Sequence, residues 1–294
     1  MLRYLVIADA HANLPALEAV FEHANGKYDK VIYLGDHVGY GPFPEETTQM
    51  IKQKADFVIQ GNHDLAAVDL SMIEWFNPYA KAMIFYTRLP GVLSADSLGF
   101  LESLEEKTAL NDKKFLLTHG CPHNNYDYIL RWIDAVTQIE HIEDKNATPI
   151  VFFAHSHNKS IFYERGGVPY IPSQSSYHLQ TDKVIFVNPG SIGQPRDDPI
   201  NGIDMPMNYA FASYGILNVN DDGKMEFQFH EATYSLDPLI EKYLEIHPAI
   251  VNAIHDNIDE FDKDERKKVS RNGKVVTKLV NRLMRQGSIT LALQ

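Results

Sequence analysis

Histidine and aspartate gather in five short clusters, and these side chains are the ones with which the chain can do chemistry. Carboxylate, amide and imidazole groups together form a mixed oxygen and nitrogen ligand set. Such a set suits Mn, Fe, Zn, Ni or Co and is too rich in nitrogen for a dedicated Mg or Ca site. The sequence therefore predicts a centre for divalent transition-metal ions. The clusters are Asp9-Ala10-His11, Gly35-Asp36-His37, Gly61-Asn62-His63-Asp64, His119 and His155-Ser156-His157.

The spacing of these residues is compatible with two ions that share one ligand. Asp9 and His11 are two residues apart, as are His155 and His157, and residues at i and i+2 of an extended chain lie on one face. One aspartate can give an oxygen to each of two metals, and Asp36 is the candidate for this bridge. Two ions about 3.5–4 Å apart clamp the attacking and leaving oxygens of an in-line displacement and lower the pKa of a bound water.

Each cluster taken singly has an ordinary explanation. An Asp-x-His pair is often a surface pair, and Gly-Asn-His-Asp is compatible with a simple turn, because glycine, asparagine and aspartate favour turns. Five clusters in series, each following a predicted strand, are harder to explain in this way. Structural turns would not select histidine so consistently.

Short apolar runs precede the clusters and are predicted to be buried strands. Between the first two, Asn13 is expected to cap a helix with Pro15 in its first turn, which indicates α/β units. Loops at the carboxyl ends of such strands converge from distant parts of a chain, so the clusters are expected to meet there. The predicted strands are residues 2–8, 30–34, 56–60, 113–118 and 149–154.

The other segments divide into helical and strand-rich regions. Residues 64–112 are predicted to be helical, with residues 73–87 the clearest segment. From residue 160 to 231, short β-rich runs between turns predict a more antiparallel, meander-like half. The tail is again predicted to be helical, and its residues 274–285 are basic and amphipathic. They form either a patch for an anionic partner or, as we favour, a helix docked on its own acidic domain.

Composition bounds the class of protein. The chain has 294 residues, a net charge of −12 and hydrophobic and charged fractions of 44% and 22%, which are ordinary values for a globular protein. The acidic balance argues against a nucleic-acid partner. No apolar stretch is long enough for a membrane span, and Cys121 is the single cysteine, so no disulfide can form within the chain. These observations predict a cytoplasmic protein with no membrane partner; they do not predict its oligomeric state.

In their order the clusters resemble the calcineurin-like metallophosphoesterases, whose pattern is Asp-x-His, Gly-Asp, Gly-Asn-His-Asp/Glu, His and Gly-His-x-His. The chain matches this pattern, with Ala154 in place of the last glycine. Gly-Tyr-Gly-Pro at 39–42 and Asn-Pro-Gly-Ser-Ile-Gly-Gln-Pro-Arg at 188–196 resemble a bacterial or archaeal branch. The resemblance implies an α/β (α+β) fold, a four-layer αββα sandwich. It covers a catalytic domain at 1–235, and residues 236–294 are then a helical C-terminal extension packed on or near it.

The resemblance also implies roles for individual residues. Asp36 would bridge the two ions, and His63 would lie over the substrate phosphate, where it stabilises charge or protonates the leaving oxygen. A metal-bridging hydroxide would attack phosphorus in line. The ligands of the first ion would be Asp9, His11 and His157, and those of the second Asn62, His119 and His155.

The chain departs from the protein Ser/Thr phosphatases of this family. Those enzymes carry Asp and Arg where Gly39 and Tyr40 stand here, which argues against protein phosphatase activity, because a catalytic acid or base without an orienting partner is weaker. Asp64 is the candidate to orient His63 instead. Arg196 is the candidate phosphate contact, because a guanidinium suits bidentate anion binding.

The implied function is hydrolysis of a phosphomonoester or phosphodiester by a dinuclear metal-dependent phosphoesterase. The expected partner is a small phosphorylated substrate, with a nucleotide or a dinucleoside polyphosphate among the candidates. The alternative is a catalytically weak or inactive metal-binding scaffold with the same fold; the intact ligand set and His63 favour the enzyme.

Several smaller signals leave their alternatives open. An aromatic group around residue 75 either lines a nucleoside pocket or, as we favour, belongs to the core. A second group after His119 either borders the cleft or does not. Residues 188–191 are expected to form a supporting turn, and neither His37 nor Cys121 is expected to act in the chemistry. The two groups are Trp75, Phe76 and Tyr79, and His123, Tyr126, Tyr128 and Arg131.

Overall fold

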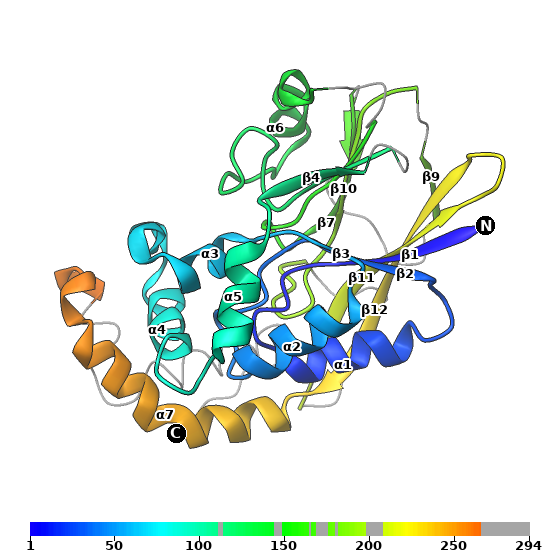
Figure 1. Cartoon of the computed structure of the whole chain (residues 1–294). Coiled ribbons are helices and arrows are strands. Elements are labelled where there is room, and N and C mark those ends of the chain that lie inside the picture. Colours follow the sequence, from blue (N-terminus) through cyan, green and yellow to red (C-terminus); the bar gives the residue numbers. More distant parts are fainter. Residues whose placement is uncertain are drawn as a thin grey trace.

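Two six-stranded sheets lie against each other in the computed structural model, with helices on both outer sides (Figure 1). The structure describes residues 1–110, 114–143, 149–164, 166–168, 176–179, 182–197 and 208–265. The basic stretch at residues 274–285 lies outside the described residues.

The first sheet combines parallel and antiparallel strands. β1 pairs in parallel with β2 and β2 with β3, whereas β1–β11, β11–β12 and β12–β9 are antiparallel. In spatial order its strands are β3 (Phe57–Val58), β2 (Lys30–Tyr33), β1 (Leu2–Ile7), β11 (Tyr209–Val219), β12 (Met225–Ser235) and β9 (Ser176–Leu179).

The second sheet is built in the same mixed way. β5 and β10 flank β6 in parallel, and the remaining pairs are antiparallel. In spatial order its strands are β4 (Lys107–Leu110), β5 (Phe115–Thr118), β6 (Ile150–Phe152), β10 (Ile185–Pro189), β7 (Lys159–Tyr163) and β8 (Gly166–Val168).

Side-chain alternation along the strands builds the layers. Tyr4 and Val6 of β1 belong to the apolar core between the two sheets, whereas Leu5 and Ile7 pack into the core beneath the helices. On β6 the neighbour of Phe152, Val151, faces outward into a third cluster. Because successive residues of a strand point to opposite faces, both sheets are covered on both sides. The predicted four-layer αββα fold is therefore confirmed.

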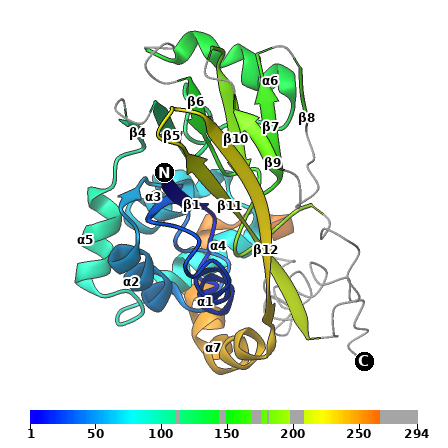
Figure 2. The ribbon, with the colours of Figure 1, turned by 90° about the vertical axis from the view of Figure 1, so that its right-hand side faces the viewer.

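The helices are distributed unequally over the two outer faces. Figures 1 and 2 show α6 (Trp132–Thr137) over the second sheet and α1, α2, α4, α5 and α7 on the side of the first. Asn13 caps α1 as predicted, since its Oδ1 accepts a hydrogen bond from the Ala16 amide at 3.2 Å. The remaining helical segments are α1 (Leu14–His23), α2 (Pro44–Lys54), α3 (Asn62–Val68), η1 (Leu70–Trp75), α4 (Pro78–Thr87), α5 (Ala95–Ser103), η3 (Ile139–His141), α7 (Asp237–Asp256) and η5 (Ile258–Glu260).

Two predictions about the elements are wrong. Lys107–Leu110 lies in the region predicted to be helical, yet it forms the edge strand β4; this strand is partly exposed and offers no apolar run to detect. The strands after residue 160 pair with one another antiparallel, as predicted. They do not form one meander, because the chain crosses between the sheets: β7, β8 and β10 join the second, and β9, β11 and β12 the first.

The C-terminal helix α7 packs on the preceding part of the chain. It contacts α4, and its buried side chains, among them Leu239, Tyr243 and Ile250, join the core beneath the first sheet. Within the described ranges, no helix combines the length and the apolar character that a bilayer-spanning segment needs.

Candidate metal centre and substrate cavity

The candidate ligands follow five parallel strands. Asp9 and His11 come after β1, and Asp36 after β2. The other clusters follow β3, β5 and β6 of the two sheets. Carboxyl ends of strands are the usual place for a site in an open α/β sheet. The structure thus brings the five clusters together, as the sequence predicts.

Two groups of ligand atoms form at this point, and they share one aspartate. Asp9, His11, Asp36 and His157 each place one donor atom within 4.8 Å of the others, and all four side chains are buried. Asp36, His119 and His155 form a second such group. Asn62 belongs with the second group, because its Oδ1 lies 3.1 Å from His119 Nε2.

The histidine rings of the first group are arranged for a cation. His11 Nδ1 lies 3.1 Å from the Val38 carbonyl oxygen and His157 Nδ1 lies 2.8 Å from that of Gln194. A carbonyl oxygen only accepts, so both Nδ1 atoms carry the proton and both Nε2 atoms present lone pairs. These two Nε2 atoms lie 3.1 Å apart. A metal ion is the partner that such a pair fits.

The same test favours a metal at the other ligands. His119 Nδ1 lies 2.7 Å from the Leu34 carbonyl oxygen, to which it donates, so its Nε2, 3.3 Å from Asp36 Oδ2, is the nitrogen that would bind a metal. Both carboxylate oxygens of Asp9 are buried without a hydrogen-bond partner among the described residues. Buried carboxylates are normally paired or bound to metal. The residues present therefore fit a pair of divalent cations.

Burial and mutual charge shift the pKa values of these groups in the absence of metal. Burial raises the pKa of Asp9 to about 8, and it lowers the pKa of His11 to about 4 and that of His155 to about 3. Burial also acts to lower the pKa of His119, but the charges of Asp36 and Asp9 outweigh it and raise that pKa to about 9. His11 and His155 are thus held neutral, the form in which imidazole binds metal.

The ligand-bearing loops adopt left-handed backbone. Asp9, His11 and Asp36 have φ angles of 52°, 48° and 61°, and His155 and His157 both have 62°. For residues other than glycine this region is uncommon and costs about 1–2 kcal/mol per residue. Such conformations persist where surrounding structure imposes them, and they cluster at functional sites.

Hydrogen bonds from residues outside the five clusters hold these loops in place. Asn188 Nδ2 donates to the Ala154 carbonyl and to Ser156 Oγ, both at 3.0 Å, and Ser191 Oγ donates to the Asp9 carbonyl at 3.0 Å. The prediction that residues 188–191 form a supporting turn is confirmed. Asn125, which the sequence analysis missed, supports His119 by accepting its amide hydrogen bond at 2.7 Å.

His63 lies among aromatic rings. Its side chain is 5% exposed, and its ring centroid is 4.9 Å from that of Tyr40 and 4.4 Å from that of Phe76. Burial lowers the pKa of His63 well below its usual value. A Cβ atom on Gly39 would lie 2.0 Å from His63 Nδ1, so the ring occupies the space that an aspartate at position 39 would need. Aromatic packing thus orients His63.

Asp64 has a different role from the predicted one. Its carboxylate accepts hydrogen bonds from the amides of Asp36 and Gly61 at 2.8 and 2.9 Å, and from His37 Nδ1 at 2.8 Å. Nδ1 of His63 has no hydrogen-bond partner among the described residues. The prediction that Asp64 orients His63 is therefore wrong. Asp64 holds the Asp36 loop, and His37 is its buried partner and lies outside the cavity.

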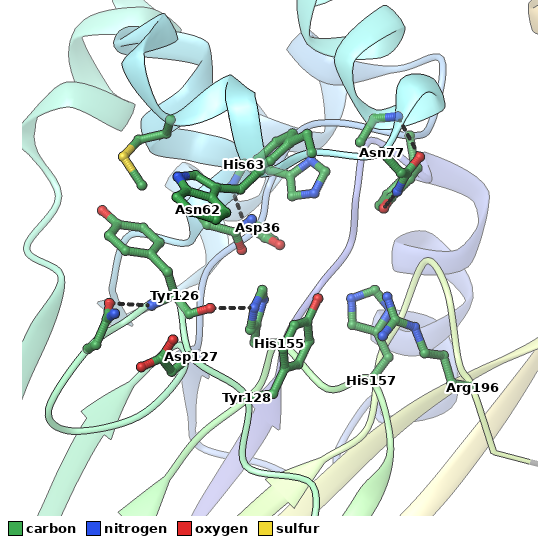
Figure 3. Close-up of a pocket in the computed structure, with 16 residues that line it drawn as sticks. Asp36, Asn62, His63, Asn77, Tyr126, Asp127, Tyr128, His155, His157 and Arg196 are labelled. Carbon is green, nitrogen blue, oxygen red and sulfur yellow. Dashed lines mark hydrogen bonds between the residues drawn. The ribbon is translucent and has the colours of Figure 1, made fainter. Parts of the chain in front are cut away.

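A cavity of about 580 Å³ opens over the two groups of ligands. In Figure 3, Asn62, His63 and Asn77 lie on one side, and Tyr126, Asp127, Tyr128 and Arg196 on the other. Arg196 thus lines the cavity, and its contact with phosphate stays a prediction. Figure 3 also shows His155 and His157 pointing into the space between the two sides.

Some of the aromatic and polar residues singled out in the sequence line this cavity, and others do not. Trp75 and Phe76 line it, whereas Tyr79 does not. The favoured core assignment is wrong for Trp75, while Phe76 and Tyr79 do pack against the core. Tyr126 and Tyr128 line it too, while His123 and Arg131 do not. Burial raises the pKa of the Cys121 thiol to about 12, which agrees with the expected lack of a catalytic role. Lining residues that the sequence analysis missed include Met72, Asn77, Asn124 and Asp127.

Comparison with known proteins agrees with this geometry. The family profile described as the calcineurin-like phosphoesterase superfamily domain matches residues 2–204. An uncharacterized protein of Methanocaldococcus jannaschii is 32% identical over 197 residues, which span 65% of this chain and 76% of the relative. The crystal structure of a metallophosphoesterase from Sphaerobacter thermophilus is similar, with a TM-score of 0.67 and 28% identity, over 86% of this chain and 98% of that one.

Proposed function

The chain belongs to the calcineurin-like phosphoesterase superfamily, and from that premise we propose that it hydrolyses a phosphate ester with the aid of two divalent transition-metal ions. The observation that carries the proposal is the pair of buried ligand groups joined at Asp36. A shared carboxylate between two such groups is what a dinuclear centre requires. Protein phosphatase activity is not part of the proposal, since Gly39 and Tyr40 replace the acidic and basic residues that those relatives use.

The two groups of buried ligand residues would each hold one ion. Asp36 would be the ligand that both ions share. Divalent ions at such a centre act as Lewis acids on the phosphoryl group and lower the pKa of water. One ion would be held by Asp9, His11 and His157, and the other by Asn62, His119 and His155.

Arg196 and His63 supply the interactions of the chain with the phosphoryl group. The Arg196 guanidinium, which reaches the cavity, binds phosphate oxygens and stabilises charge that develops in the transition state. His63 is neutral in its aromatic surroundings, and its Nδ1 faces Gly39. Its Nε2 is the nitrogen left to meet the substrate, where it donates a hydrogen bond to the leaving oxygen and assists the departure of the leaving group.

The first experiment measures hydrolysis of an aryl phosphomonoester and an aryl phosphodiester with and without added Mn. Wild-type protein should turn over at least one ester in a Mn-dependent way, and His63→Ala should lower kcat by about 10²–10⁴. His141→Ala is the matched control, because His141 is exposed and lies outside the cavity. Metal content measured on the same samples should be two ions per chain.

The competing function is a metal-binding scaffold that does not catalyse hydrolysis. Folded protein that carries two ions per chain and turns over neither ester would favour that function. Turnover that survives unchanged in His63→Ala would leave the hydrolase in place and remove His63 from its mechanism.

A further inference from the structure

Aromatic side chains line both sides of the cavity. Its lining beyond the ligands includes Trp75, Phe76, Tyr126 and Tyr128. Trp75 is 83% exposed and Tyr128 is 44% exposed. A large apolar surface left open within a cavity of this size marks a ligand site more often than a packing defect.

These aromatic residues contact the candidate metal ligands directly. The Tyr126 carbonyl oxygen lies 3.1 Å from Nε2 of His155, and the Tyr128 ring stacks on the His155 ring with centroids 3.9 Å apart and planes 16° apart. On the other side Phe76 packs on His63, and Trp75 precedes it in the chain. A group bonded to a phosphate at the metal centre would therefore meet aromatic side chains at once.

The charges of the cavity limit how many phosphates it can take. Among the described lining residues, Arg196 is the one with a permanent positive charge, and Asp127 adds a carboxylate next to Tyr126 and Tyr128. A polyphosphate chain extending from the centre would need further cations to offset its charge. Asp127 instead suits a neutral group that donates hydrogen bonds, such as ribose hydroxyls or the amino group of a base.

We infer that the substrate is a nucleoside phosphate ester with a single phosphate, and that Trp75 determines specificity by stacking on the base. The inference rests on the proposed phosphoesterase function and narrows its substrate class. Stacking on an aromatic side chain tolerates any base, because every base has a π face. The cavity is therefore expected to select for the presence of a base more than for its identity.

The binding test compares AMP with ribose 5-phosphate, which share the sugar and the phosphate and differ by the base. The chain has two tryptophans, so Trp132→Phe leaves Trp75 as the sole tryptophan reporter in the full-length, Mn-loaded protein. AMP should quench its fluorescence in a saturable way at concentrations at least about fivefold below those at which ribose 5-phosphate binds. Equal binding of the two probes would overturn the inference.

The kinetic test uses the same pair of compounds as substrates. Wild type should show a kcat/KM for AMP at least about fivefold above that for ribose 5-phosphate, and Trp75→Ala should bring the ratio near one. Trp132→Ala is the matched control, since Trp132 lies on α6 outside the cavity and should leave the ratio unchanged.

The outcomes separate the inference from the function on which it rests. Equal turnover of both compounds, unaffected by Trp75→Ala, would overturn the substrate class and leave the phosphoesterase intact. Quenching by AMP with no turnover of any ester would retain the stacking site and refute the hydrolase. A ratio that falls equally in Trp75→Ala and Trp132→Ala would show a general loss of structure and overturn the role of Trp75.

Discussion

A buried lysine joins the two sheets beside the metal centre, and its removal should destabilise the protein strongly. Lys159 opens β7 of the second sheet, and its side chain is 0% exposed. Its Nζ lies 2.6 Å from Glu231 Oε1 and 3.3 Å from Ser213 Oγ, both on the first sheet, and 3.1 Å from Asp197 Oδ2. Asp197 directly follows Arg196. Lys159→Met keeps most of the side-chain volume and removes the charge.

The magnitude follows from what the substitution leaves behind. The side chains of Asp197 and Glu231 are 2% and 11% exposed, so both carboxylates would lose their buried cation and gain little water. Removal of one partner from a buried ion pair costs about 3–5 kcal/mol. At roughly 2–4 °C per kcal/mol for a large domain, Tm should fall by about 6–20 °C.

The assay is urea and thermal unfolding of metal-stripped protein, because bound metal would add its own stabilisation. Lys242→Met is the matched control. Lys242 pairs with Glu245 on the surface of α7, with side-chain exposures of 26% and 67%, and such pairs are worth about 0–1 kcal/mol. If Lys159→Met loses no more stability than Lys242→Met, the attraction within the buried group does not exceed its desolvation cost and the reasoning fails.

Three further predictions concern the site and its surroundings. Asp36→Asn should lower the bound metal measured by elemental analysis below two ions per chain and reduce turnover; full activity with both ions retained would exclude the bridging role. Tyr243→Phe removes the hydrogen bond from α7 to the Tyr40 carbonyl, which is 2.5 Å long. It should cost about 1–3 kcal/mol of unfolding free energy and lower kcat, because Tyr40 packs on His63; unchanged stability and kcat would contradict this coupling. Cys121 should resist alkylation in the folded protein at pH 8, because its pKa is raised to about 12 and the reactive thiolate forms only as the pH approaches that value. Equal rates of labelling with and without denaturant would contradict this prediction.

The positions of most candidate ligands could be predicted because they follow buried apolar strands; the exception is Asn62, whose preceding strand β3 has two half-buried residues. A run such as residues 2–8 defines a strand end, and the carboxyl ends of parallel strands meet at one edge. The αββα layers came from the family resemblance, and side-chain alternation along the strands confirms them. What sequence signals leave undetermined is which sheet each later strand joins, since apolar runs of similar length fit either sheet.

Other features depend on packing that no local pattern records. Trp75 is a large apolar residue of the kind expected in a core. It is exposed because η1 places it at the cavity. Asp64 lies next to His63 in the sequence, yet adjacent side chains of a helix point in different directions, and its carboxylate turns to the Asp36 loop. Lys159 was missed as well. Its partners on the other sheet cannot be identified from the sequence, because they lie on strands that are distant along the chain.

The left-handed backbone at the candidate ligands bears on how this protein could be engineered. Glycine at Asp9 would relieve the conformational cost there and remove a buried carboxylate that has no hydrogen-bond partner among the described residues, so the metal-stripped protein would gain stability as it lost a ligand. A screen for thermal stability alone would therefore select substitutions at the candidate metal ligands, and its products would be stable proteins that do not bind metal. Selection for thermostable variants of this chain has to be coupled to retention of metal at every round.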